Sequence, residues 1–243
     1  MAAFEPYLPL NVPKPFADGV WIIDGPEIRM RYGPVALPFT TRMVVVRLAT
    51  GGLWVHSPVA PDAQLLQAVD ALGPVRHLIA PNSIHYWYMA DWLDRYPDAV
   101  SYAVPGLARR AKRPFRIDHV LDDDHLPTAW GDEIDWVVVP GTAVTEAAFH
   151  VRPASTVILA DLIENFELPR IKGRLHRLLV RLGGADGGTP HDLKMTFRPK
   201  RRQVAGRVRL ILAWRPDKVI MAHGRPYASD GAAHLDRALA WAV

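Results

Sequence analysis

Histidine and acidic side chains follow the ends of several predicted strands in this sequence. They are His56 after Leu53–Val55, His85 after Leu78–Ala80, Glu146 after Val137–Val139, Asp161 after Val157–Ala160 and His223 after Val219–Met221. Strand ends are where α/β folds place ligands and catalytic groups. Each residue alone is also explained as a polar cap or turn residue, so the hypothesis of a site depends on the set.

The chemistry open to this set is narrowed by the absence of cysteine. Without thiolates, any metal must be held by His, Asp or Glu. Imidazole and carboxylate groups bind Zn²⁺ and Fe²⁺ at about 2.0 to 2.2 Å, and they also act as general acids and bases. The sequence has neither a serine in a Gly-x-Ser-x-Gly turn nor a phosphate-binding glycine loop.

The elements that must position these residues follow a β-then-α order twice. Valine-rich and aromatic runs predict strands, and apolar residues at helical spacing predict helices. In the first half we expect strands at Val20–Asp24, Arg42–Leu48, Leu53–His56, Val75–Ala80 and Ala99–Val104, with helices at Asp62–Leu72 and Ser83–Tyr96. In the second half we expect strands at Ile134–Val139, Ala147–Val151, Thr156–Ala160 and Lys218–Met221, with helices at Ile171–Leu182, Gln203–Trp214 and from about Gly231 to Ala242. The pattern indicates an α/β fold.

Three segments then resemble the metallo-β-lactamase-like superfamily. The strand ending in Ala160-Asp161 and the later Met221-Ala222-His223-Gly224 are similar to the second half of that family, where an Asp bridges two metals and a His-Gly supplies a ligand. Val139-Pro140-Gly141-Thr142 resembles its Pro-Gly-His turn, with Thr142 in place of the histidine. The resemblance covers roughly residues 20 to 225. It implies an αββα sandwich built from two β-then-α halves.

The defining His-x-His-x-Asp-His motif of that family is depleted here. The corresponding segment reads Ala80-Pro81-Asn82-Ser83-Ile84-His85, and it keeps one imidazole. Similarly, His56 stands where the family has a structural Asp. The sequence therefore resembles an uncharacterised branch of the superfamily with a degenerate site.

From the resemblance we expect at most one metal ion, Zn²⁺ or Fe²⁺, with His85, Asp161 and His223 as ligands. Glu146 is expected as a fourth ligand or a general base, and Asn82 as a residue that orients substrate or water. The implied function is a metal-dependent hydrolase of an ester, lactone or related bond in a small molecule. The alternative is a non-catalytic binding or interaction protein that kept the scaffold and lost the metal.

The bulk properties favour one folded domain over residues 1–243. Apolar residues make up 49% of the 243 residues and charged residues 22%, which is ordinary for a globular protein. Four prolines within residues 1–18 predict an extended arm rather than a paired strand. Neither a membrane span nor a secretory signal is visible, so we expect a cytoplasmic protein.

Positive charge is concentrated in residues 170–209 although the net charge is only +4. A solvated surface explains this stretch most simply. An acidic partner, nucleic acid or an anionic membrane surface are the alternatives. Ile171–Leu182 combines a leucine face with basic residues, as an interfacial helix does. The oligomeric state is not predicted.

Overall fold

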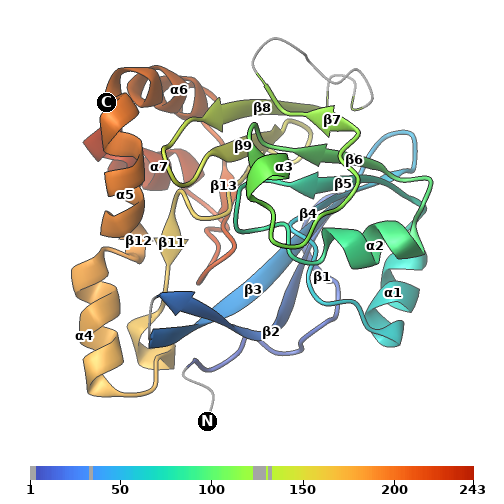
Figure 1. Cartoon of the computed structure of the whole chain (residues 1–243), viewed down its shortest axis with the longest axis horizontal. Helices are drawn as coiled ribbons and strands as arrows, with labels where there is room; N and C mark the ends of the chain where they lie inside the picture. The colour runs from blue at the N-terminus through green and yellow to red at the C-terminus, as the bar shows by residue number, and fades with distance from the viewer. Residues whose placement is uncertain (1–3, 33–34, 123–129, 131–132) are drawn as a thin grey trace.

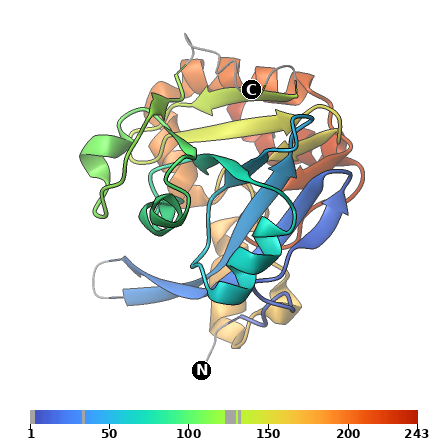
Figure 2. The same cartoon turned by 90° about the vertical axis from the view of Figure 1, so that its right-hand side faces the viewer.

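The computed structural model places two β-sheets face to face between two groups of helices. It describes residues 4–32, 35–122, 130 and 133–243. Figures 1 and 2 show the two sheets stacked as inner layers, with α1 and α2 on the outer side of the first sheet and α5 to α7 on the outer side of the second. The predicted αββα sandwich of two β-then-α halves is confirmed.

Within the described part of the chain, the first sheet has seven strands that follow one another in sequence order. They are β1 (Lys14–Ala17), β2 (Val20–Tyr32), β3 (Val35–Arg47), β4 (Leu53–His56), β5 (Val75–Ala80), β6 (Val100–Ala103) and β7 (His119–Val120). Strands β1 to β4 pair antiparallel, and β4 to β7 pair parallel. Parallel neighbours need a crossover connection. The crossovers contain α1 (Ala63–Asp70), α2 (Met89–Arg95) and α3 (Leu107–Arg110).

The second sheet has the order β13-β10-β9-β8. Its strands are β8 (Ile134–Val139), β9 (Glu146–Val151), β10 (Thr156–Ile158) and β13 (Lys218–Ile220). Its outer helices are α5 (His191–Phe197), α6 (Arg201–Ala213) and α7 (Gly231–Leu239). Between β10 and α5 the chain forms β11 (Glu164–Asn165), η2 (Leu168–Arg170), α4 (Arg174–Gly183) and β12 (Asp186–Gly188). The 3₁₀ turn η3 (Arg198–Lys200) precedes α6, and η4 (Ala240–Ala242) follows α7. β11 and β12 pair with each other.

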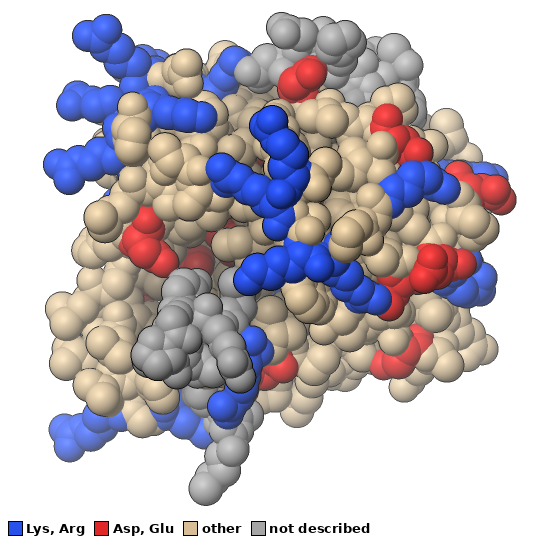
Figure 3. Space-filling view, in the orientation of Figure 1, with Lys and Arg blue, Asp and Glu red and all other residues tan. Residues whose placement is uncertain are grey.

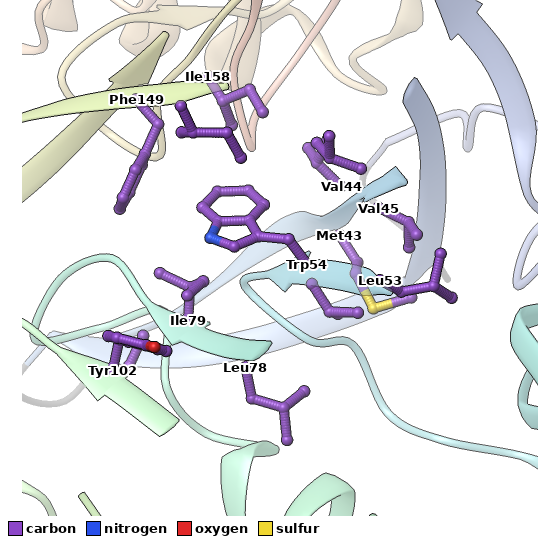
Figure 4. Packing of buried hydrophobic residues seen from close by; sticks show 14 of the residues in the cluster. Met43, Val44, Val45, Leu53, Trp54, Leu78, Ile79, Tyr102, Phe149 and Ile158 are labelled. Carbon is purple, nitrogen blue, oxygen red and sulfur yellow. The ribbon is translucent and has the colours of Figure 1, made fainter. Parts of the chain in front are cut away.

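Alternation along β8 explains why the second sheet is buried on both faces. Trp136 and Val138 pack into the core between the sheets, whereas Val137 and Val139 pack against the outer helices. Successive side chains of a strand point to opposite faces, so an apolar run buries both. Figure 4 shows Trp54 of β4 between the sheets, facing Phe149 and Ile158 of the second sheet. Its ring centroid lies 5.0 Å from that of Phe149.

The structure differs from the sequence-based expectation in two elements, a helix next to the site and a strand in the N-terminal arm. The helix expected over Ser83–Tyr96 begins only at Met89. The Asn82 side chain accepts hydrogen bonds from the main-chain N–H groups of Ile84 and His85, and such a local bond competes with helix formation. In the Pro-rich arm, Lys14–Ala17 pairs with β2 although a paired strand was not expected there. A proline can occupy such an edge strand because its missing N–H can face away from the ladder.

No helix among the described residues is both long enough and apolar enough to cross a membrane.

Candidate metal centre

Three of the predicted residues meet at the edge where strands of both sheets end. His85 lies in the turns after β5, Asp161 follows β10 and His223 follows β13. One ligand atom from each lies within 4.8 Å of the other two. The Nε2 atoms of His85 and His223 each lie 3.1 Å from the same oxygen, Asp161 Oδ1. The structure therefore brings together one imidazole from the first half of the chain with an acid and an imidazole from the second.

These distances and donor types fit a single transition-metal ion. Two nitrogen ligands and one carboxylate are a set that Zn²⁺ and Fe²⁺ accept. Atoms that share one ion at about 2.0 to 2.2 Å lie about 3 to 4 Å apart, which matches the two 3.1 Å separations. His85, Asp161 and His223 could thus hold one ion.

Ionisation in this cluster centres on Asp161. Burial alone would raise the pKa of its carboxyl, but the charge of His85 and hydrogen bonds from His223 and His85 outweigh burial and lower that pKa. Burial lowers the pKa of His223, and hydrogen bonding to Asp161 offsets this only in part. For His85 the balance is reversed: burial opposes the charged form, yet the Asp161 carboxylate raises the pKa above its ordinary value. Asp161 is therefore the anion around which the imidazoles are arranged.

Glu146, predicted as a fourth ligand or a general base, binds the main chain at Asp161 and on both sides of it. Its Oε1 accepts the N–H groups of Ala160 and Leu162 at 2.9 and 3.0 Å, and its Oε2 accepts that of Asp161 at 2.8 Å. Burial and the charge of Asp161 raise the pKa of Glu146 above its usual range. A carboxylate used in this way fixes the turn that carries Asp161. These contacts favour a positioning role for Glu146.

Asn82, predicted to orient substrate or water, is fully buried beside Glu146. Its Nδ2 donates to Asp161 Oδ2 at 2.7 Å and to Glu146 Oε2 at 3.1 Å. Its Oδ1 accepts the two main-chain N–H groups that begin the turn to His85. An amide can donate two hydrogen bonds and accept two, so all its capacity is used within the protein. Asn82 joins the turn of His85 to the carboxylate of Asp161.

Two residues at the predicted motif positions do not join the cluster. Thr142, where the family has a histidine, is exposed, and its hydroxyl and N–H both donate to the carbonyl of Thr196. His56, where the family has a structural Asp, is buried between aromatic rings, and neither ring nitrogen has a hydrogen-bond partner among the described residues. Burial and the charge of His85 lower the pKa of His56 to about 3. It is a neutral core residue.

Sequence reasoning missed three residues of the site. Ser57 Oγ lies 2.8 Å from His85 Nδ1, on the opposite side of the ring from Asp161. Glu164 on β11 is buried near Asp161, and Arg42 on β3 holds the loop of His223 by donating to the carbonyls of Met221 and Gly224. Two of them could have been found from the sequence, because Ser57 directly follows the predicted strand Leu53–His56 and Glu164 lies three residues after Asp161. Arg42 could not, since it opens a valine-rich strand.

A cavity of about 290 Å³ opens directly onto the cluster. Asp161 and His223 form part of its wall, and Phe39, Phe166 and Leu193 are among its apolar residues. The ring of His223 stacks on Phe166 at a centroid distance of 5.9 Å and lies 5.4 Å from Phe39. Figure 3 shows acidic side chains in and beside a hollow on the left side of the molecule. A ligand in this cavity would meet mostly apolar side chains.

Glu164 is a second buried acidic group in the wall of this cavity, beside Asp161. No described residue donates a hydrogen bond to its carboxyl, and 7% of the residue is exposed. Burial first, and then the charges of Asp161, Asp192 and Glu146, raise its pKa well above the ordinary value. A neutral carboxylic acid facing an apolar cavity can donate one hydrogen bond and accept another.

Residues 18–172, more than half of the chain, match the model of a protein family described as a domain of unknown function, DUF4336. The chain belongs to the DUF4336 family. The matched range contains His85, Glu146 and Asp161 and ends before α4 and His223. A search of the curated proteins gave no match to this DUF4336 chain.

Solved structures show that the DUF4336 chain has the metallo-β-lactamase fold. It is similar to DIM-1 metallo-β-lactamase, with a TM-score of 0.61 at 10% identity over 95% of this chain and 97% of that one. FIM-1 from Pseudomonas aeruginosa, in its mono-zinc form, gives 0.60 at 15% identity over 95% and 94%. An enzyme from Hirschia baltica gives 0.57 at 16% identity over 93% and 94%. At these identities the similarity shows a shared fold, so the predicted metallo-β-lactamase-like fold is confirmed.

Proposed function

We propose that this DUF4336 chain is a hydrolase that uses one divalent transition-metal ion, held by His85, Asp161 and His223. The observation that carries the proposal is the convergence of two imidazole nitrogens on one buried carboxylate oxygen at 3.1 Å each. A Zn²⁺ or Fe²⁺ ion at such a site supplies Lewis acidity toward a carbonyl or phosphoryl oxygen and toward water. The mono-zinc FIM-1 structure supports this, because a protein of the same fold is known with one zinc.

The chain's own residues support the ion in distinct ways. Ser57 can accept the Nδ1 proton of His85, which fixes the ring so that Nε2 faces the cluster. Asn82 donates to Asp161 Oδ2, which leaves Oδ1 directed at both imidazoles. Glu146 holds the main chain on both sides of Asp161. Histidine ligands in metal sites commonly depend on such outer contacts.

The cavity narrows the substrate class. Its wall is largely apolar, so the substrate has an apolar group next to the bond that is cleaved. Glu164 adds one hydrogen-bond donor or acceptor for a polar group of the substrate. We infer a small-molecule ester, lactone or related compound with an apolar substituent.

Two alternatives arise from the same geometry. Ser57, His85 and Asp161 form a hydrogen-bonded chain of the residue types used by serine hydrolases, but Ser57 is 5% exposed and His223 has no role in such a chain. The second alternative is a binding protein without metal. It is favoured by Asp161 Oδ1 lying within hydrogen-bonding distance of both imidazoles, so the cluster can satisfy itself.

Metal content separates these functions. The chain is purified without a histidine tag, stripped with a chelator and titrated with Zn²⁺ and with Fe²⁺ under anaerobic conditions. We expect about one ion per chain for the unaltered protein and for His191→Ala, whose exposed imidazole lies outside the cluster, and almost none for His223→Ala or Asp161→Asn. Equal trace binding by all four proteins would support the metal-free alternative instead.

Activity is measured on chromogenic esters and lactones of increasing acyl length. We expect hydrolysis by the loaded protein, its loss with chelator, and its recovery when the metal is returned. Ser57→Ala should keep measurable activity, because Ser57 acts through His85. Covalent labelling of Ser57 by a fluorophosphonate, together with full activity in chelator, would replace the metal proposal with the serine one.

A further inference from the structure

Helix α4 is attached to the domain by one edge and exposes the rest of its surface. None of its ten residues is buried. Val180 attaches the helix to the domain, because its side chain packs against a small apolar cluster that contains Phe166 and Ala185. Figure 1 shows α4 at the lower left edge of the molecule, outside the two sheets and their covering helices.

The exposed surface of α4 carries a stripe of leucines. Leu175, Leu178, Leu179 and Leu182 are 68%, 51%, 53% and 64% exposed. Their spacing of three and four residues places them on one face of the helix. Val180 is two residues from Leu178 and from Leu182, close to half a turn away, so these two leucines face away from the attachment, whereas Leu179 borders the cavity next to Val180. Four exposed leucines on one face form an apolar patch of the kind that marks an interaction site.

Basic side chains accompany the leucines. Residues 168–185 contain Arg170, Lys172, Arg174, Arg177 and Arg181 and no acidic residue. Within the described part of the chain, no carboxylate forms an ion pair with Lys172, Arg174 or Arg181. Figure 3 shows the lower left of the molecule as largely uncharged surface with Lys or Arg side chains along its lower edge.

The leucine stripe and the basic residues together favour one kind of partner. Arg170 is paired with Glu167. A second copy of the chain would still bring Lys172, Arg174 and Arg181, which form no ion pair among the described residues, against their own copies, which opposes self-association through this face. Nucleic acid would satisfy the cations but would leave the leucine stripe in water. An anionic lipid surface provides both an apolar layer for the leucines and negative charge for the basic residues.

We propose that α4 docks on an anionic lipid surface, with Leu175, Leu178 and Leu182 inserted at the headgroup boundary and the neighbouring arginines on lipid phosphates. His176 and Leu179 of the same helix line the cavity that reaches Asp161 and His223. Docking therefore places one wall of the cavity at the lipid surface. The inference goes beyond the proposed hydrolase activity, and it does not depend on metal.

Vesicle binding by the full chain tests the proposal. Sedimentation with vesicles of phosphatidylcholine alone is compared with vesicles that contain 30% phosphatidylglycerol. We expect binding at least about tenfold tighter to the anionic vesicles, weakening as salt is raised. Leu178→Ser/Leu182→Ser should lose binding at least about tenfold, whereas Leu210→Ser, which alters an exposed leucine on α6, should not change it.

A single-site probe locates the contact, since the chain has no cysteine of its own. An environment-sensitive fluorophore on Leu182→Cys should shift to shorter wavelength on anionic vesicles, and the same label on Leu210→Cys should not. Arg174→Gln/Arg181→Gln should reduce the preference for anionic lipid, and Arg201→Gln/Arg202→Gln on α6 should leave it intact.

Several outcomes would overturn the proposal. They are equal binding to both kinds of vesicle, a shift of the label on α6 alone, or a dimer in solution that Leu178→Ser/Leu182→Ser dissociates. Binding of duplex DNA that the arginine variants weaken and the leucine variants leave unchanged, without vesicle binding, would assign the face to nucleic acid.

Discussion

The Arg42 guanidinium donates a hydrogen bond of 2.7 Å to the main-chain carbonyl of Gly224, the residue that follows His223. The same nitrogen donates to the carbonyl of Met221 at 2.8 Å, and Nε donates to the buried carboxylate of Asp24 at 2.9 Å. A strand of the first sheet therefore fixes the loop that carries a site residue of the second sheet.

Replacing Arg42 with methionine should strongly destabilise the fold. The variant leaves two carbonyls without their donor and leaves buried Asp24 paired only with Lys14. Breaking a buried ion pair typically costs about 3 to 5 kcal/mol, and the remaining lysine places this case at the lower end. Urea unfolding measures the loss. Arg47→Met, an exposed position on the same strand, is the control, and equal stability of the two variants would contradict the role given to Arg42.

Gly224→Ala should disturb the turn behind His223 by more than a backbone penalty. Gly224 has φ of +87°, and a Cβ there would lie 1.9 Å from the carbonyl oxygen of Asn165. Gly51 has φ of +81° with open space around it, so Gly51→Ala measures the conformational cost alone, about 1 to 2 kcal/mol. We expect Gly224→Ala to lose clearly more stability in thermal unfolding and to weaken metal binding. Similar losses for both variants would show that the turn can shift freely.

Glu146→Gln tests whether Glu146 positions the turn of Asp161. Its oxygens accept three main-chain N–H groups and one from Asn82. A glutamine amide would turn a donor toward at least one of them, at a cost of about 1 to 3 kcal/mol for the unsatisfied buried group. Glu133→Gln, whose carboxylate accepts from Ala49 at the surface, should lose little in urea unfolding. A Glu146→Gln protein as stable as the control would favour a role for Glu146 at the ion instead.

Protonation of His56 should make the folded chain less stable as the pH is lowered. Burial and the charge of His85 lower its folded-state pKa to about 3, against an unfolded value of about 6.5. As pH falls below about 6.5 the unfolded chain takes up a proton that the folded chain refuses, so stability decreases by up to about 1.4 kcal/mol per pH unit until the folded pKa is reached. His56→Phe keeps the aromatic contacts and should flatten this slope in chelator-treated protein. An unchanged slope in urea titrations from pH 7 to pH 4.5 would mean that other groups cause it.

The sequence by itself determined the order of elements and the residue types of the site. The spacing of apolar residues that distinguishes a strand from a helix involves only residues close in sequence. The strands β4, β5 and β8 accordingly have the predicted bounds. The positions after the strands singled out His85, Asp161 and His223, because strand ends of an α/β fold gather at common edges.

Only the tertiary structure decided what each side chain does there. The Asn82 side chain accepts a main-chain N–H where the helix was expected to begin. Glu146 accepts main-chain N–H groups, and Arg42 donates to the carbonyl of Gly224, 182 residues away in sequence. The contacts of Glu146 and Arg42 join residues 14 or more positions apart, so no local spacing predicts them. The Asn82 contacts are local, but its side chain is also held by Asp161, which lies 79 residues away. The exposure of the leucines on α4 is likewise a tertiary property, because an amphipathic pattern in sequence cannot tell a helix that covers a core from one that faces outward.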